Sequence, residues 1–433
     1  MKSIKIQFGA LLALTYLFAG AAHAVMKIEI TQAGQSALPI AVVPFGYTGE
    51  QALSEDIAEV VGSDLARSGR FRPLDRQDLV ATPQSGDTIQ YGNWRLSGVD
   101  YLLVGKVNLI QDQTYQVQFQ LLDVIRQEPM TGYNLTVQDG RLRQAAHEIA
   151  DIVFEKILGE PGTFNTQIAY ISTEGGADNR FYRLQVADSD GANPVPVLTS
   201  KRPLMSPAWA PDARRLAYVS FEDRNRSAIY IQDTRDGSRR KLISRRGING
   251  APTWSPDGKR IAATLSHTGD PEVFVIDVES GALTQVTRNG AIDTEPSWVD
   301  NNTLVFTSDR SGSPQIYESS VDGGRVTRLT FEGRYNASPA VSSDGRSVAL
   351  VHGAEGRYRI AVIDRPTGLM SVITDGSLDE SPSFSPNGGM ILYASESGGK
   401  GVLGAVSVDG SVRQRISLTE GDVREPAWSP LLQ

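Results

Sequence analysis

Between residues 163 and 433 the chain alternates short apolar runs with turns rich in Gly, Pro, Asn and Asp, and this alternation has a fixed period. At six places, 43 to 45 residues apart, a proline stands two residues before an aromatic or apolar residue and a turn: Pro207, Pro252, Pro296, Pro339, Pro382 and Pro426. β-Branched and aromatic runs follow the first five turns, for example at residues 216–220 and 391–395. Short strands closed by such turns predict hairpins, and four strands per repeat predict the blade of a β-propeller.

The phase of the repeat predicts how the ring closes. Residues 168–172 form a strand-like run with no proline motif before it, and the motif at residues 426–430 has no such run after it. The two halves complete one blade, so we expect six blades, with the last strand innermost in the first blade. The alternative, an open stack of repeats, would leave its sheet edges unpaired.

Residues 25–160 do not share the repeat. Apolar runs at residues 40–45, 99–104 and 115–121 predict strands, and helical periodicity predicts helices at residues 50–67 and 141–158. Glycine and proline at residues 159–162 predict a linker. The expected fold is therefore an α/β N-terminal domain at residues 25–160, followed by an all-β six-bladed propeller at residues 163–433.

The first 24 residues have the features of a signal peptide. Lys2 and Lys5 precede an apolar stretch at residues 8–18, and Ala22 and Ala24 fit the small-residue rule for cleavage between Ala24 and Val25. An uncleaved anchor is the weaker alternative because the apolar stretch is short. The chain has no cysteine, which excludes lipid attachment at this site and disulfides. Export to a bacterial periplasm is the expectation.

Charge and motifs disfavour two classes of function. The net charge of −8 becomes more negative once Lys2 and Lys5 are removed, which disfavours nucleic-acid binding. The basic segment at residues 235–246 is better explained as a solvated face. No Gly-x-Ser-x-Gly motif is present, and the glycine pattern at residues 399–404 opens a strand rather than a helix.

Three further features have simple structural interpretations. His147 and Asp151 resemble half of a zinc-protease motif, but the second histidine is missing, so we expect His147 to be a surface residue. Asp188 and Asp190 lie in a segment that lacks the other ligands of a calcium loop, so we expect a hairpin turn there. The four repeat tryptophans, Trp209, Trp254, Trp298 and Trp428, could stack on sugars, but their fixed place favours packing between blades.

Taken together, the signal peptide, the α/β domain and the propeller resemble the TolB family of the Tol–Pal system. The resemblance covers the whole chain and rests on residues 44–45, 98–105, 295–298 and 426–430, with departures at Asp300 and Val341. It implies a monomeric, non-enzymatic binding protein without cofactor. Its implied partners are the lipoprotein Pal, held at the propeller tunnel mouth, and TolA, held by the mature N-terminus. Other outer-membrane proteins and translocating toxins are further candidate partners.

The residues that lead into each innermost strand are the expected Pal site. They are Met205, Ser206, Asn249, Ala251, Thr294, Glu295, Tyr335, Asn336, Asp379, Glu380, Arg424 and Glu425. Hydrogen bonding between blades is an equally good explanation for any one of them. The carboxylates among them could instead hold a cation in the tunnel. Glu295, Glu380 and Glu425 could also serve a glycosidase or lyase acting on cell-wall carbohydrate, which is the competing class.

The expected TolA segment comprises Val25, Lys27, Ile28, Glu29, Ile30 and Thr31. Its alternation of polar and apolar residues suits pairing with the edge of a partner's sheet. The alternative is an ordinary first strand of the α/β domain. Both hold if the segment switches between docked and free states.

Overall fold

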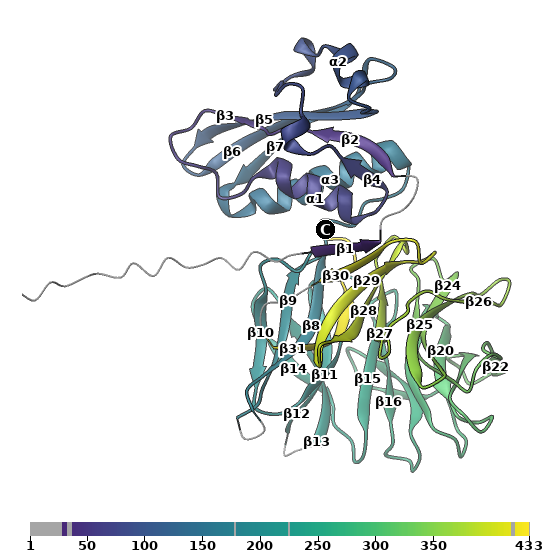
Figure 1. The fold of residues 1–433 in the computed structure, drawn as a ribbon. Coiled ribbons are helices and arrows are strands. Elements are labelled where there is room, and N and C mark those ends of the chain that lie inside the picture. Colours follow the sequence, from purple (N-terminus) through teal and green to yellow (C-terminus); the bar gives the residue numbers. More distant parts are fainter. Residues whose placement is uncertain (1–27, 33–36, 177–178, 224–225, 417–420, 433) are drawn as a thin grey trace, which may run out of the picture.

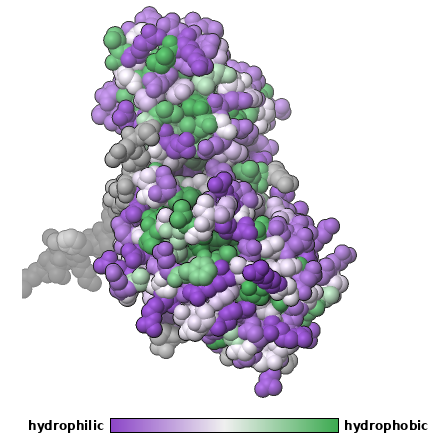
Figure 2. Space-filling view, turned by 90° about the vertical axis from the view of Figure 1, so that its right-hand side faces the viewer, coloured by the Kyte–Doolittle hydropathy of each residue, from purple (hydrophilic) through white to green (hydrophobic). Residues whose placement is uncertain are grey.

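The computed structural model describes residues 28–32, 37–176, 179–223, 226–416 and 421–432 (Figure 1). The signal peptide, its cleavage site at Ala24 and Val25, and Lys27 therefore lie outside the described residues. An α/β domain lies above a β-propeller, and the molecule is narrower where the two domains meet (Figures 1 and 2). Among the described residues, none of the helices is both long and apolar enough to cross a membrane.

The N-terminal domain is a mixed sheet with helices on its faces. Its strand order is β4 (Phe71–Pro73), β2 (Leu38–Val42), β5 (Tyr101–Gln111), β6 (Thr114–Asp123) and β7 (Glu128–Gln138), and β3 (Gly46–Tyr47) also pairs with β5. Helices α1 (Ile57–Arg67) and α3 (Leu142–Leu158) share one apolar core with Ile40 and Leu103. The short helix α2 (Tyr91–Leu96) places Trp94 in a second cluster with Ala41 and Leu102.

The two predicted helices are confirmed, with boundaries that local chemistry explains. Helix α1 begins later than expected because Asp56 caps it, and the Asp56 carboxylate accepts a hydrogen bond from Glu59 N at 3.1 Å. Helix α3 ends at Gly159, whose φ of 74° is a left-handed conformation that glycine adopts without strain. The predicted strands at residues 40–45, 99–104 and 115–121 correspond to β2, β5 and β6. Strands β3, β4 and β7 and helix α2 were not predicted.

The predicted six-bladed propeller is confirmed. In the described part of the chain, six sheets each have four propeller strands. From the innermost strand outward, the blades are β31 (Asp422–Trp428), β8 (Gln167–Glu174), β9 (Phe181–Asp188) and β10 (Val195–Ser200); β11 (Leu204–Trp209), β12 (Arg215–Asp223), β13 (Arg226–Asp233) and β14 (Arg239–Ile243); β15 (Asn249–Trp254), β16 (Arg260–Leu265), β17 (Glu272–Asp277) and β18 (Leu283–Gln285); β19 (Asp293–Asp300), β20 (Thr303–Ser308), β21 (Gln315–Ser320) and β22 (Thr327–Arg328); β23 (Tyr335–Val341), β24 (Ser347–Ala354), β25 (Arg357–Asp364) and β26 (Leu369–Val372); and β27 (Glu380–Phe384), β28 (Met390–Ser397), β29 (Lys400–Ser407) and β30 (Arg413–Ile416).

The ring closes in the predicted way. Strand β31 pairs antiparallel with β8, with Trp428 opposite Ile168 and Arg424 opposite Ile171. The indole Nε1 of Trp428 donates a hydrogen bond to Thr166 Oγ1 at 2.9 Å, so the end of the chain is fastened to the start of the propeller. The open stack is therefore wrong.

The repeat tryptophans pack between blades, as expected. Each is at most 8% exposed. Trp209 Nε1 donates to Ala427 O of the preceding blade at 3.2 Å, and Trp298 Nε1 donates to Thr253 O at 3.1 Å. Their rings are therefore not available to stack on a sugar.

Strand β1 (Ile28–Gln32) lies outside the sheet of the α/β domain. It pairs antiparallel with β30, the outermost strand of the last blade, with Ile28 opposite Ile416 and Glu29 opposite Arg415. The blade thereby gains a fifth strand (Figure 1). The alternative that made this segment the first strand of the α/β sheet is wrong, because its backbone partner belongs to the propeller.

Candidate partner-binding mouth and domain junction

A cavity of about 540 Å³ opens where the six innermost strands begin. Asn387, in the turn that follows β27, donates a hydrogen bond to Pro161 O of the domain linker, so the opposite ends of these strands face the α/β domain. The cavity therefore lies on the propeller face turned away from that domain. Seven of the twelve predicted mouth residues line it: Met205, Ser206, Ala251, Glu295, Tyr335, Glu380 and Glu425.

The other five predicted residues are placed differently. Asn249, Asn336 and Asp379 are at most 1% exposed and hold loops together. Asn336 Nδ2, for example, donates to Gln315 Oε1 at 2.9 Å, and Asp379 Oδ1 accepts from Ser395 Oγ at 2.6 Å. Thr294 and Arg424 lie on innermost strands but do not line the cavity.

A repeated backbone feature decides which residues face the cavity. The residue before each repeat proline has a left-handed φ between 46° and 55°: Ser206, Ala251, Glu295, Ser338, Ser381 and Glu425. The pairing register of every innermost strand also shifts around this residue and the proline. A bulge of this kind re-aims side chains, so simple alternation along the strand does not identify the lining.

The bulge also directs backbone N–H groups to the neighbouring blade. Ser338 N and Ser338 Oγ donate to the Glu295 carboxylate at 2.9 and 2.8 Å, and Thr307 Oγ1 donates to it at 2.9 Å. Ser206 N donates to Glu425 in the same way. Glu295 and Glu425 thus line the mouth and also join blades, which combines the two roles considered for them. Burial raises the pKa of Glu425, although Ser206 N opposes this effect.

Further apolar residues line the mouth beyond those that were predicted. Leu378 and Tyr358 line the cavity, and they are 37% and 39% exposed. Ile248 and Ile292 occupy the same repeat position as Leu378, four residues before a proline, and are about half exposed. An apolar residue repeated at this position could have been recognised in the sequence. Exposed apolar residues at the start of an innermost strand do not serve the core of a blade and therefore indicate a binding surface.

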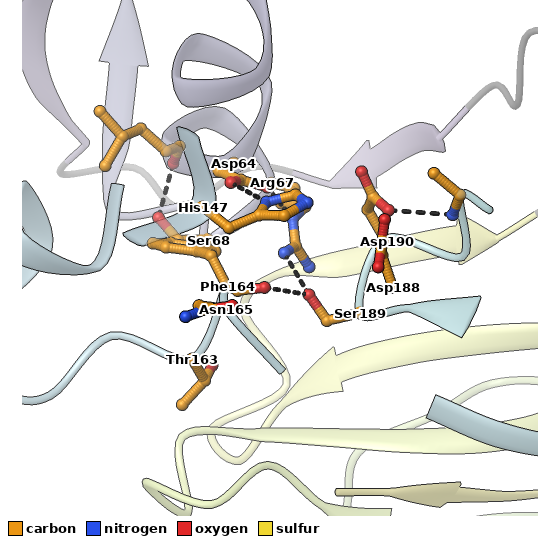
Figure 3. A network of polar contacts seen from close by, with 12 residues as sticks. Asp64, Arg67, Ser68, His147, Thr163, Phe164, Asn165, Asp188, Ser189 and Asp190 are labelled. Atoms are coloured by element: carbon orange, nitrogen blue, oxygen red, sulfur yellow. Dashed lines mark hydrogen bonds and ion pairs between the residues drawn. The ribbon is translucent and has the colours of Figure 1, made fainter. Parts of the chain in front are cut away.

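A second polar cluster joins the two domains (Figure 3). His147 on α3 is 2% exposed, and its Nδ1 lies 2.6 Å from Asp64 Oδ2 on α1. The expectation that His147 is a surface residue is therefore wrong, because packing of α3 against α1 covers it. Arg67 Nε donates to Asp64 Oδ1 at 2.9 Å, and Arg67 Nη2 donates to Ser189 Oγ of the propeller at 2.7 Å.

The turn after β9 supplies the propeller side of this cluster. Asp188 and Asp190 flank Ser189, and both form ion pairs with Arg143 of α3. Burial lowers the pKa of His147, but the Asp64 carboxylate outweighs it, so the net shift is upward. The predicted turn at these aspartates is present, but its side chains contact the N-terminal domain rather than only solvent.

Comparison with known proteins covers both domains. Residues 26–130 match the TolB amino-terminal domain, and residues 154–432 match the TolB beta propeller domain. The Tol-Pal system protein TolB of Thioalkalivibrio sulfidiphilus is 49% identical over 427 residues, 98% of either chain. That of Xanthomonas oryzae pv. oryzae is 47% identical over 409 residues, 94% of this chain and 93% of the relative. The crystal structure of TolB from Acinetobacter baumannii is similar with a TM-score of 0.86 and 41% identity, covering 94% of this chain and 100% of that one.

The fold and the mouth define a two-domain protein in which an α/β module is fastened to a closed six-bladed propeller with an open cavity at its far face. The chain belongs to the TolB family, a non-enzymatic component of the Tol–Pal system. The resemblance inferred from the sequence is thus confirmed. The competing class, a glycosidase or lyase, is wrong for this protein.

Proposed function

We propose that this protein is a periplasmic scaffold that binds Pal at the propeller mouth and TolA through its N-terminal segment. Linking an outer-membrane lipoprotein to an inner-membrane protein would serve outer-membrane integrity and constriction during division. Membership of the Tol–Pal system supports partners of this kind. The signal-peptide pattern of residues 1–24 supports the compartment.

The cavity at the mouth is the observation that carries the Pal proposal. It is concave, and its lining combines apolar side chains such as Met205, Tyr335 and Leu378 with the carboxylates of Glu380 and Glu425. Tyr335 and Tyr358 form an edge-to-face pair with ring centroids 5.2 Å apart, which makes a rigid aromatic wall. Apolar anchors with a few oriented polar groups are typical of sites that accept a protruding segment of a partner.

The pairing of β1 supports the TolA proposal. Strand β1 is added to the outer edge of a blade that already has its four strands, so its loss leaves that blade complete. A short strand held at a sheet edge by backbone pairing is suited to exchange between one edge and another. We propose that undocking from β30 makes residues 25–31 available to TolA.

Ala251→Arg tests the mouth. The side chain would project into the cavity, and we expect Pal affinity to fall at least tenfold, about 1.4 kcal/mol. Thr284→Arg, on the exposed outer strand β18 of the same blade, is the matched control and should bind Pal normally. Thr294→Arg is a weaker probe, because Thr294 does not line the cavity. Normal Pal binding by Ala251→Arg, measured by calorimetry on a folded variant, would place the site elsewhere.

A disulfide can test the switch of β1. Glu29 and Arg415 are paired opposite each other, and Cα atoms of antiparallel partners lie within the range that a disulfide spans. Because the chain has no other cysteine, Glu29→Cys with Arg415→Cys can form a single bridge. We expect TolA binding to be lost when the bridge is oxidised and to return on reduction, while Pal binding stays unchanged. Equal TolA binding in both redox states would contradict the proposal.

A further inference from the structure

Two sequence features that looked unimportant separately meet at the domain junction. One ring nitrogen of His147 and one carboxylate oxygen from each of Asp188 and Asp190 lie within 4.8 Å of one another. His147 comes from α3 of the N-terminal domain, whereas Asp188 ends β9 and Asp190 lies in the turn between β9 and β10 of the propeller. Figure 3 shows His147 between Asp64 on one side and the turn carrying Asp188 and Asp190 on the other.

The imidazole is oriented as a metal ligand is. Its Nδ1 lies 2.6 Å from Asp64 Oδ2, whereas its Nε2 is buried and has no hydrogen-bond partner among the described residues. Leaving a buried ring nitrogen unpaired costs free energy. Carboxylates that hold one ring nitrogen of a histidine while the other binds a metal are a common arrangement in zinc sites.

The aspartates retain oxygens that could join His147 as ligands. Asp188 Oδ2 accepts from Asn193 Nδ2 at 2.8 Å and pairs with Arg143, which leaves Asp188 Oδ1 without a partner in the described part of the chain. Asp190 Oδ1 accepts from Ala192 N at 2.9 Å, and a carboxylate oxygen has a second lone pair.

The net charge of the cluster also favours the binding of a cation. Four carboxylates surround two guanidinium groups, namely Glu55, Asp64, Asp188 and Asp190 around Arg67 and Arg143. A metal binds the neutral imidazole, so it displaces the ring proton, and with His147 neutral the cluster has a net charge of −2, which a divalent ion would balance. A buried cluster with uncompensated charge is unfavourable.

We propose that His147, Asp188 and Asp190 form a binding site for a divalent transition-metal ion, with Zn²⁺ as the best fit, that crosslinks the two domains. Zn²⁺ accepts imidazole nitrogen and carboxylate oxygen at about 2.0–2.2 Å, usually with four ligands, so water would supply the fourth. Ligand atoms around such an ion are separated by roughly 3–4 Å, so the three groups need to move closer by at most about 1–2 Å. Hard ions such as Ca²⁺ prefer all-oxygen ligands and should bind less tightly.

Zinc titration of the full chain tests the site. The protein is purified without a histidine tag and stripped with a chelator, and Zn²⁺ is added in competition with a chromogenic chelator. We expect one equivalent to bind with a Kd of about 1 µM or tighter and to raise the melting temperature. The absence of cysteine removes competing thiolates. If no saturable binding is observed up to about 100 µM Zn²⁺, the proposal is wrong.

Variants assign the binding to these residues. Asp188→Asn and His147→Gln should each weaken Zn²⁺ binding at least tenfold. Because His147 is buried and its replacement could impair folding, Asp188→Asn, whose side chain is 25% exposed, is the decisive variant. His352→Gln is the matched control, since His352 is also buried but bonds to Asn336 in the propeller. Zn²⁺ binding that survives Asp188→Asn unchanged, or that is lost equally in His352→Gln, would contradict the assignment.

Discussion

Single residues break local rules at repeated positions in this protein. The six residues before the repeat prolines have positive φ, although none is glycine, and such a conformation costs on the order of 1 kcal/mol per residue. The cost is offset where the freed N–H group donates to the neighbouring blade, as Ser338 N does to Glu295. The same bulge turns the side chains of Ala251 and Ser206 toward the cavity. Strain and binding surface therefore arise from one backbone feature.

Asp151 provides a prediction at the same scale. Its carboxylate accepts from Phe164 N at 2.7 Å and from Asn165 N at 3.0 Å, yet burial raises its pKa to about 6. A carboxyl with a raised folded pKa stabilises the fold most below its unfolded pKa, and this contribution is lost as pH rises to about 6. The Asn side chain of the variant Asp151→Asn does not titrate. The free energy of unfolding of the variant, relative to that of the wild type, should therefore rise by on the order of 2–3 kcal/mol between pH 4 and pH 7.

Urea unfolding of both proteins at several pH values measures this difference. Asn has one acceptor oxygen where Asp151 has two, so the variant loses part of the bonding to Phe164 N and Asn165 N. This loss lowers its stability by the same amount at every pH. Only the pH dependence of the difference tests the pKa. Parallel stability curves for the two proteins would show that Asp151 does not take up a proton on folding.

At the scale of elements, two strands from distant parts of the chain complete the same propeller in different ways. Strand β31 is the innermost strand of its blade and closes the ring, with pairing to β8 and the Trp428–Thr166 bond. Strand β1 is added outside a complete blade. We therefore expect the loss of β31 to be far more damaging than the loss of β1.

Deleting residues 424–433 should open the ring and expose the edge of β8, because that edge pairs with β31. We expect loss of cooperative unfolding and aggregation, because unpaired strand edges recruit other chains. Deleting residues 25–36 is the matched control and should leave melting nearly unchanged. Calorimetry and size-exclusion chromatography measure both effects. A C-terminally truncated protein that stays monomeric with unchanged melting would argue against closure by β31.

At the scale of the whole molecule, Arg67 connects the two domains. Its side chain bonds to Asp64 and Ser189, its guanidinium lies 5.0 Å from the Phe164 ring centroid, and its carbonyl oxygen accepts from Gln414. Arg143 also contacts both domains, through Glu55 in the N-terminal domain and Asp188 and Asp190 in the propeller. We expect the coupling between the domains to depend on Arg67 because its side chain is buried between them.

Arg67→Ala should cost about 3 kcal/mol, because it leaves the buried Asp64 carboxylate with one partner fewer. We also expect calorimetry to resolve separate transitions for the two domains. Arg70→Ala is the control, since Arg70 is 49% exposed and lies 3.6 Å from an exposed Glu160, a pair worth about 1 kcal/mol at most. A single transition with unchanged stability in Arg67→Ala would mean that the domains are coupled elsewhere.

Local patterning accounts for most of what sequence analysis predicted correctly. The proline–tryptophan repeat sets the strands of each blade, and its phase at residues 168 and 428 determines the closure. Helices α1 and α3 followed from their apolar periodicity. Strand β7 was not predicted, because Val137 is its only buried residue and its sequence therefore shows no alternation of apolar and polar residues. Helix α2 has six residues and is too short to show a period.

The sequence by itself determined the two domains and the number of blades, because helix and strand patterns depend on residues close in the chain and the proline motif recurs every 43 to 45 residues. The family followed from motifs spread along the whole chain. Only the tertiary structure decided that Asn249, Asn336 and Asp379 are buried rather than open to the mouth. It also decided that β1 pairs with β30 and that His147 meets Asp188 and Asp190. These outcomes depend on groups brought together by the packing of whole elements, and no periodicity along the chain encodes such distant partners.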